Sequence, residues 1–281
     1  MYPASFEYFR PSSVDEAIAL LKRHGEDAKI LAGGHSLIPA MKLRLAMPKY
    51  VVDIGRIGGL DYIREASGRI AIGAMTTHHA IEASALLAEK CPLLPETAGH
   101  IGDVQVRNRG TIGGSLAHAD PAGDWPAAIL ALDAELELAG PRGRRTIKAE
   151  NFFVDLLQTE LAQDEVLCEI RVPITSRQVA YEKTEQKASG FAIAGVAAVV
   201  EKGGDVRVAI TGVAAKAYRA KAVERALSGQ TAPSAEAIAR AAAQAAEKVE
   251  ALGDIHASPD FRRHLAEVNT ARALTRAYSV R

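Results

Sequence analysis

The last third of the chain places its strand patterns before its helical patterns. Apolar residues dominate 191–200 and 206–213, and alanine-rich helical periodicity follows them. Ser234 is in an N-cap position and predicts a helix that reaches about Leu252, and Ser258 is placed to cap a final helix. A chain that makes its strands first and its helices afterwards packs the helices as a layer on the sheet. This order predicts a C-terminal α+β domain with an antiparallel sheet under a helical layer.

The start of the chain has the order helix, strand, loop, strand. Residues 13–16 have the spacing of a capping box and precede apolar residues that share one helical face. Short apolar stretches at 29–32 and 50–54 each run into glycine, which is typical of strands that end in a turn. This order predicts a small α/β unit that closes near residue 57.

Alternating apolar and polar residues characterise the middle of the chain. A single helix is expected from Thr77 through Ile81 to about Lys90, where Pro92 ends it. The expected strands are residues 62–65, 69–72, 134–138, 145–148 and 166–173. The pattern predicts a second, larger α+β unit, so the chain divides into residues 1–57, 58–175 and 176–281.

Two glycine pairs lie where a short strand is expected to give way to a loop, in Ala32–Ser36 and in Thr111–Ser115. Paired glycines let backbone N–H groups converge on an anion, and a neighbouring hydroxyl adds a donor. Neither segment has the G-x-G-x-x-G pattern of a Rossmann fold or the G-K-[ST] of a P-loop. A glycine pair after a strand most often forms a plain turn, so each segment is a candidate diphosphate cradle with a turn as its alternative. Asp124 precedes a helical stretch and either caps that helix or accepts hydrogen bonds from a ribose.

Charge and cysteine content exclude several classes of function. The 34 basic residues balance 34 acidic ones, which leaves no basic footprint for nucleic acid. No stretch is apolar enough to span a membrane, and the first twenty residues lack the order of a signal peptide, which predicts a cytoplasmic protein. Cys91 and Cys168 are too few for an iron–sulfur cluster, which takes four thiolates.

Histidine and arginine do not form a recognisable catalytic or metal-binding motif. His78 and His79 are adjacent, whereas a helical metal site needs ligands one turn apart, so no metal ligand is predicted. Arg107 and Arg109 are expected to position loops or to face a partner. No arrangement of serine, histidine, cysteine and carboxylate supports nucleophilic catalysis, and no catalytic residue is predicted.

Four motifs together resemble a known family. They are AGGHSLIPAMKLR, DVQVRNRGTIGGSLAHADPAGDWPAAILALDAELEL, AIAGVAAVV and DIHASPDFRRHL. In this order they resemble the FAD-binding medium subunits of the molybdenum hydroxylases, especially those of the carbon monoxide dehydrogenase type. The resemblance implies a two-part FAD-binding domain of the vanillyl-alcohol-oxidase (PCMH) type followed by a C-terminal α+β domain.

The resemblance also implies roles for individual residues. The first glycine segment would wrap the FAD diphosphate, the second would approach the flavin-proximal phosphate, and Asp124 would contact the adenosine ribose. Leu161 would contact adenine, Phe191 would cover the flavin, and Lys187 would place a positive charge near the isoalloxazine. The residues expected to bind the cofactor are Ala32, Gly33, Gly34, His35, Ser36, Ile101, Gly102, Thr111, Ile112, Gly113, Gly114, Ser115, Asp124, Leu161, Lys187 and Phe191.

The function implied is electron transfer. The molybdenum cofactor would belong to a large partner subunit and two [2Fe–2S] clusters to a small one, in a dimer of heterotrimers. FAD on this chain would pass the electrons to an external acceptor, since the cofactor carries the redox chemistry and the protein orients it. Two alternatives remain open: an FAD subunit of a related aldehyde, xanthine or N-heterocycle dehydrogenase, and a nucleotide-binding assembly module without redox turnover.

Overall fold

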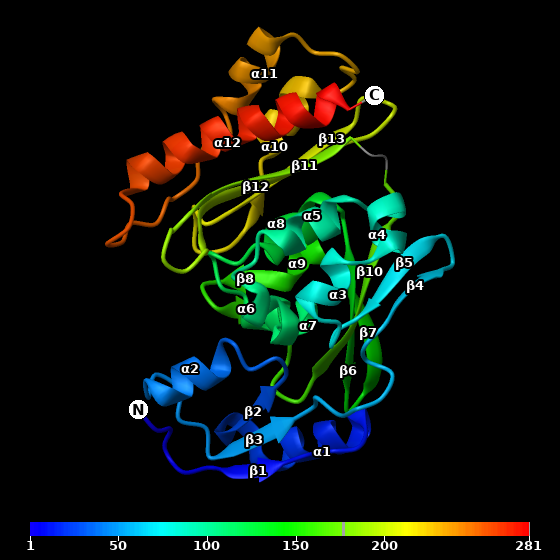
Figure 1. Cartoon of the computed structure of the whole chain (residues 1–281), viewed down its shortest axis with the longest axis vertical. Helices are drawn as coiled ribbons and strands as arrows, with labels where there is room; N and C mark the ends of the chain where they lie inside the picture. The colour runs from blue at the N-terminus through cyan, green and yellow to red at the C-terminus, as the bar shows by residue number, and fades with distance from the viewer. Residues whose placement is uncertain (176–177, 281) are drawn as a thin grey trace.

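The computed structural model describes residues 1–175 and 178–280, which form three parts stacked along the long axis of the molecule (Figure 1). The first part is a three-stranded parallel sheet in the order β1-β3-β2, covered by α1. Its elements are β1 (Glu7–Phe9), α1 (Val14–His24), a short 3-10 turn (Gly25–Asp27), β2 (Ala28–Leu31), α2 (Leu37–Lys42) and β3 (Tyr50–Asp53).

Ser13 caps α1 as expected, but the return hydrogen bond to Glu16 comes from Ser12 rather than from Ser13. The side chain of Ser13 accepts a hydrogen bond from the Glu16 N–H at 3.1 Å, and the Glu16 carboxylate accepts one from the Ser12 N–H at 2.7 Å. The buried face of α1 packs against the sheet through Ala17 and Leu21. The expected helix and both expected strands are therefore confirmed, whereas β1 and α2 were not expected.

A five-stranded antiparallel sheet in the order β4-β5-β10-β6-β7 forms the second part. Its strands are β4 (Ile63–Ala66), β5 (Arg69–Gly73), β6 (Glu135–Gly140), β7 (Gly143–Lys148) and β10 (Val166–Pro173). The same part contains a separate antiparallel pair, β8 (Phe153–Asp155) and β9 (Gln158–Thr159). One face of the large sheet is covered by short helices: α3 (His78–Glu82), α4 (Ala85–Lys90), α5 (Leu93–Gly99), α6 (Val104–Arg109), α7 (Ile112–His118), α8 (Trp125–Ala131) and α9 (Ala149–Phe152).

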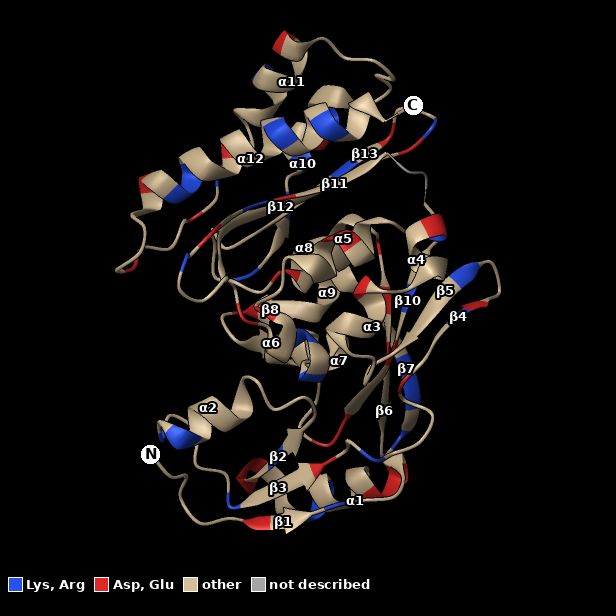
Figure 2. Cartoon of the chain, viewed as in Figure 1, with Lys and Arg blue, Asp and Glu red and all other residues tan. Residues whose placement is uncertain are grey.

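Charged residues of both signs occur along the strands of this sheet (Figure 2). Arg64 lies 3.6 Å from Glu169, Glu169 and Glu137 both pair with Arg171, and Glu137 also pairs with Arg144. Each of the two glutamates pairs with two arginines. These side chains therefore form a ladder of ion pairs across β4, β10, β6 and β7.

The third part is a four-stranded antiparallel sheet in the order β11-β12-β13-β14, with helices on both faces. Alternate residues of its central strand belong to two different cores: Val196 and Ala198 pack under α12, whereas Ala197 and Val199 pack on the second part. Burial on both faces explains why this strand has an uninterrupted apolar sequence. The elements are β11 (Val179–Glu185), β12 (Ala192–Val200), β13 (Val206–Thr211), β14 (Tyr218–Arg219), α10 (Lys221–Leu227), α11 (Ala235–Ala242) and α12 (Pro259–Ser279).

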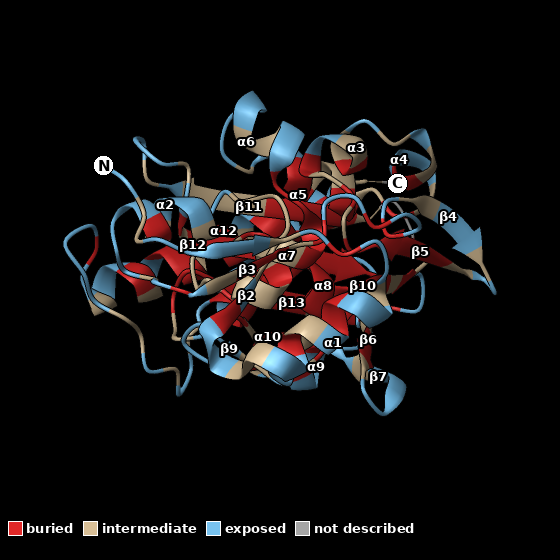
Figure 3. Cartoon of the chain, turned by 90° about the horizontal axis from the view of Figure 1, so that it is seen from below, coloured by how far each residue is buried: buried red, intermediate tan, exposed pale blue. Residues whose placement is uncertain are grey.

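A buried arginine fastens α12 to the start of β12. Arg262 is 4% exposed and donates hydrogen bonds to the carbonyls of Ile193, at 2.8 Å, and Gly212, at 2.6 Å. Its other terminal nitrogen donates to Asp254 at 2.6 Å. The last helix therefore fixes the backbone that leads into the third sheet. The α+β class with antiparallel sheets is confirmed, and Figure 3 shows buried residues inside and exposed ones on outer elements such as α6 and β4.

Three expectations about the local structure were wrong. The single helix at 77–90 is two helices, because Ser84 interrupts it and caps α4 by accepting a hydrogen bond from the Leu87 N–H. The helix from Ser234 ends at Ala242, and from Gln244 to Val249 the backbone hydrogen bonds reach only three residues back, as in tight turns. Residues 112–115 are the first turn of α7 and follow α6, so they are not a loop after a strand.

In the described part of the chain, no helix combines the length and the apolar character needed to cross a bilayer.

Candidate functional site

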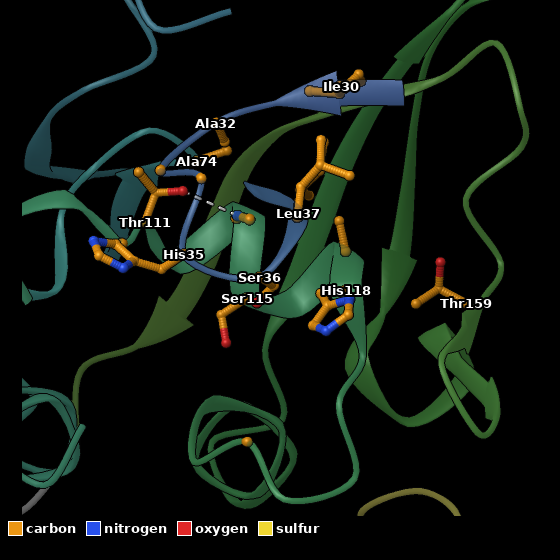
Figure 4. Close-up of a pocket in the computed structure, with 18 of the residues that line it drawn as sticks. Ile30, Ala32, His35, Ser36, Leu37, Ala74, Thr111, Ser115, His118 and Thr159 are labelled. Carbon is orange, nitrogen blue, oxygen red and sulfur yellow. Dashed lines mark hydrogen bonds between the residues drawn. The ribbon is translucent and has the colours of Figure 1, made fainter. Parts of the chain in front are cut away.

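A cavity of about 1080 Å³ lies where the three parts of the molecule meet (Figure 4). Its walls come from the first part at residues 28–40, from the second part at 74–78, 101–124 and 154–167, and from the third part at Ser189–Phe191. This volume is at the upper end of the range of cavities that hold organic ligands. The volume is therefore large enough for a ligand of the size of a dinucleotide.

Most of the residues expected to bind a cofactor line this cavity. Two of the sixteen do not: Ile112 is fully buried in the core beneath α7, and Lys187 is exposed outside the walls. Those that the fold brings together are Ala32, Gly33, Gly34, His35, Ser36, Ile101, Gly102, Thr111, Gly113, Gly114, Ser115, Asp124, Leu161 and Phe191.

The first glycine segment presents a row of unpaired backbone donors to the cavity. Among the described residues, the N–H groups at positions 33 to 37 have no hydrogen-bond acceptor, although all five residues line the cavity. Gly34 adopts φ +80°, a conformation that a side chain disfavours, and the chain turns there into α2. None of the five residues is buried, and consecutive backbone N–H groups without a partner in the protein can converge on an anion. This row is therefore a candidate site for an anionic ligand.

The second glycine segment has a different role, because its backbone donors are already used. The N–H groups of Ile112 and Gly113 donate to the carbonyls of Thr76, at 3.0 Å, and Ala74, at 2.9 Å, while Gly114 donates to Thr111 Oγ1 at 3.1 Å (Figure 4). What it offers a ligand is the hydroxyl of Ser115, which makes no hydrogen bond within the described chain. The second segment therefore lines the cavity and offers one free hydroxyl, but it does not present a row of backbone donors.

Two of the glycines allow other parts of the backbone to pack closely against them. A Cβ atom on Gly33 would lie 2.4 Å from the Arg109 carbonyl oxygen, and one on Gly113 would lie 2.5 Å from the Ala74 Cβ. Neither distance is possible between real atoms, so both positions require glycine for packing. The approach of Gly33 to residues 109–110 joins the first glycine segment to the wall that precedes α7.

Asp124 lines the cavity, yet its carboxylate is held by other side chains of the protein. It is 6% exposed and accepts hydrogen bonds from the Tyr181 hydroxyl at 2.5 Å and from Lys183 Nζ at 2.9 Å. It makes no side-chain hydrogen bond to cap α8. Burial raises the pKa of this carboxyl, an effect that the adjacent ammonium group opposes. The carboxylate connects the cavity wall to β11 and the third sheet.

Arg107 positions the part of the wall that contains Ile101 and Gly102. Its guanidinium donates to the Ile101 carbonyl at 3.2 Å, to the Gly102 carbonyl at 3.3 Å and to the Glu82 carboxylate at 2.8 Å. The side chain of Arg109 is exposed at the end of α6. Arg107 therefore has the loop-positioning role expected of it.

Sequence reasoning missed several lining residues, of which His78 is the most notable. It was weighed only as a metal ligand, whereas the fold buries it against Trp125, whose indole N–H donates to His78 Nδ1 at 3.1 Å. No motif signals this contact, because the two residues lie 47 positions apart. Within residues 1–175 and 178–280, no group of three or more histidine, cysteine and carboxylate side chains could hold a metal ion.

Comparisons with known proteins agree with this architecture. Residues 4–175 match the model of the FAD-binding domain in molybdopterin dehydrogenase, and residues 179–277 match that of the CO dehydrogenase flavoprotein C-terminal domain. The chain belongs to this flavoprotein family. It is 44% identical to the carbon monoxide dehydrogenase medium chain of Hydrogenophaga pseudoflava, over 99% of each chain, which confirms the resemblance drawn from the four motifs.

Other flavoprotein subunits of the family are also similar over nearly the whole chain. The medium subunit of nicotine 6-hydroxylase from Paenarthrobacter nicotinovorans is 36% identical over 97% of each chain. A solved structure of carbon monoxide dehydrogenase from Hydrogenophaga pseudoflava, lacking the Mo-pyranopterin moiety, superposes with a TM-score of 0.95 at 45% identity and covers 99% of each chain. The chain therefore shares its fold with this solved structure along nearly its whole length.

Proposed function

We propose that this chain binds FAD in the cavity and serves as the flavoprotein subunit of a molybdenum hydroxylase of the carbon monoxide dehydrogenase type. In that role it receives electrons from iron–sulfur clusters of a partner subunit and hands them to an external acceptor. The observation that carries the proposal is the row of unpaired N–H groups at positions 33 to 37, which fits the diphosphate of a dinucleotide.

Each wall of the cavity contributes a different function. The first glycine segment binds the diphosphate through its backbone, and Ser115 adds a hydroxyl donor from the opposite side. Ile101, Leu161 and Phe191 supply apolar surface for planar rings and exclude water from them. Bound FAD supplies two-electron chemistry, for which the protein needs no nucleophile. Lys187, exposed and outside the cavity, would act there only after the 186–191 segment moves inward.

The electrons have to arrive from other polypeptides. The whole chain has two cysteines, and both are buried and free. An iron–sulfur cluster takes four thiolates, so it cannot be built here. The relatives are named medium chains, a name that implies large and small partners. We place the molybdenum cofactor on the large partner and the [2Fe–2S] clusters on the small one, in a dimer of heterotrimers.

A second candidate substrate class is favoured by the family itself. The nicotine 6-hydroxylase medium subunit shares 36% identity over the same length, and the carbon monoxide and nicotine enzymes act on unrelated molecules. A flavoprotein subunit does not touch the substrate at the molybdenum centre. The complex could therefore oxidise an N-heterocycle, a purine or an aldehyde without a change in this cavity, and turnover of carbon monoxide and nicotine by the purified complex separates the candidates.

The cradle is tested by comparing two glycine variants in the purified complex. Gly34→Ala places a side chain at φ +80° inside the donor row, and Gly59→Ala does so at φ +78° in open space away from the cavity. Both variants incur similar backbone strain, but only Gly34→Ala should lose flavin, measured by the fluorescence of flavin released when the purified complex is denatured. Equal, full flavin content in both variants would refute the cradle. A wild-type complex that contains no flavin and does not take up FAD would instead indicate an assembly module.

A further inference from the structure

His78 holds a hydrogen-bond donor at the cavity wall that no part of the protein uses. The residue is 4% exposed and lines the cavity, and its Nδ1 accepts the hydrogen bond from the Trp125 indole at 3.1 Å. In a neutral imidazole one nitrogen accepts and the other carries the proton. Because Nδ1 is the acceptor here, the proton is on Nε2. Trp125 therefore fixes the tautomer.

The Nε2 atom is unpartnered but remains accessible. It has no hydrogen-bond partner among the described residues, and it is not sealed off as the Nε2 of His24 is. A Cβ atom on Gly110 would lie 2.6 Å from this nitrogen, so the lack of a side chain there leaves its edge uncovered. Since His78 is otherwise enclosed, the remaining access of Nε2 is to the cavity. A donor that faces a cavity and has no partner in the protein is available to a ligand.

The position of His78 relates it to the donor row. A Cβ atom on Gly33 would lie 2.7 Å from the Gly110 Cα, and Gly110 in turn lies against the imidazole edge. Gly110 thus lies between His78 and Gly33, the first residue of the donor row. Burial, with the nearby His35 and Arg107, lowers the pKa of His78 to about 4, so the ring is a neutral donor at physiological pH.

We propose that His78 is a further cofactor-binding residue, which donates a hydrogen bond from Nε2–H to an oxygen acceptor of the bound flavin dinucleotide, and that Trp125 is its positioning residue. This inference rests on the proposed function, because it assigns a donor within the same cavity. It predicts that the imidazole matters through one N–H group rather than through its bulk or its charge.

The tautomer is tested first, on the full chain labelled with ¹⁵N-histidine. The NMR spectrum should show His78 neutral with its proton on Nε2 from pH 8 to pH 5, and Trp125→Phe should mix the two tautomers. A spectrum with the proton on Nδ1 in the wild type would overturn the inference. Neither result depends on enzyme activity.

Affinity for FAD is then measured by titrating the flavin-stripped complex. His78→Leu should weaken binding about ten-fold, the usual effect of losing one hydrogen bond. His78→Gln, which can place an N–H near the same point, should recover most of the loss. His79→Leu is the matched control, because the neighbouring side chain is exposed and pairs with Glu82, and it should bind as the wild type does.

The outcomes separate the inference from the proposed function. If the wild-type complex binds FAD but His78→Leu binds it equally well, or if His78→Gln binds it no better than His78→Leu, the donor role is wrong and the FAD site stands. If the stripped wild-type complex takes up no FAD, the proposed function fails and this inference fails with it.

Discussion

Single residues decide how the cavity wall is built, and the two glycine pairs illustrate this. Both pairs were expected to offer backbone donors to a diphosphate. Only residues 33 to 37 keep their N–H groups free, whereas Gly113 and Gly114 use theirs within the protein. Similar residue patterns thus serve recognition in one segment and close packing in the other. The difference lies in contacts with residues 74–76, which no local pattern displays.

The buried imidazole of His78 predicts a pH dependence of stability. Its pKa falls from 6.5 to about 4 on folding, so the unfolded chain binds more protons between these values. The free energy of unfolding should therefore decrease as the pH falls from 6.5 towards 4, by about 3 kcal/mol in total. Urea denaturation at pH 7 and pH 4.5 measures this. The free energy of unfolding of His78→Gln should change less between the two pH values. An equal change in the variant and the wild type would contradict the assignment of this pH dependence to His78.

The sequence predicted which residues line the cavity better than it predicted the hydrogen bonds between them. The first glycine segment, Ser115 and Phe191 could be named from the sequence, and the fold brings them to one cavity. The pairing of Asp124 with Tyr181 and Lys183 could not, because the partners are 57 and 59 positions away. Long-range pairs between polar side chains leave no periodic trace in a sequence.

At the scale of elements, short side-chain caps set the boundaries of the helices around the cavity. Thr111 caps α7 and Ser84 caps α4 in the same way, with a hydroxyl that accepts the N–H three residues ahead. Strands were predicted well because alternation persists over several residues, and β10 has the expected bounds. The helix predicted at 77–90 failed because one serine can end a helical pattern and start another.

The two caps provide a matched pair of variants. Thr111→Val and Ser84→Ala should each lower the free energy of unfolding by about 1 kcal/mol, the usual cost of a lost N-cap. Only Thr111→Val should also weaken FAD binding, because α7 carries Ser115 and α4 does not line the cavity. Urea denaturation and FAD titration of both variants measure the two effects. Similar losses of FAD affinity in the two variants would show that α7 has no special part in the site.

At the scale of the whole molecule, one buried ion pair joins the second part to the third. Lys183 has a side chain that is 1% exposed, and it pairs with Asp124 at 2.9 Å while also donating to the His100 carbonyl. Lys183→Met should lower the free energy of unfolding by about 3–5 kcal/mol, because it leaves a buried carboxylate without its partner. Thermal or urea denaturation measures this loss.

The double variant shows whether the charge or the packing is responsible. Lys183→Met combined with Asp124→Asn removes both charges and should recover much of the stability lost by the single variant. If the double variant is less stable than Lys183→Met alone, the uncompensated charge is not the cause. The contact between the second and third parts would then depend on side-chain packing and on the hydrogen bond from Tyr181 to residue 124.

The sheet with helices on both faces has a consequence for how the protein is made. A ribosome releases α5 and α8 before β11 and β12, so the apolar surface that Ala197 and Val199 will cover stays open during synthesis. The backbone at Ile193 is held by Arg262 of α12, which emerges later still. The cavity wall at Ser189–Phe191 is therefore completed only when translation has almost finished. Nascent chains should need protection from aggregation over this interval, and cofactor loading should be a step that follows translation.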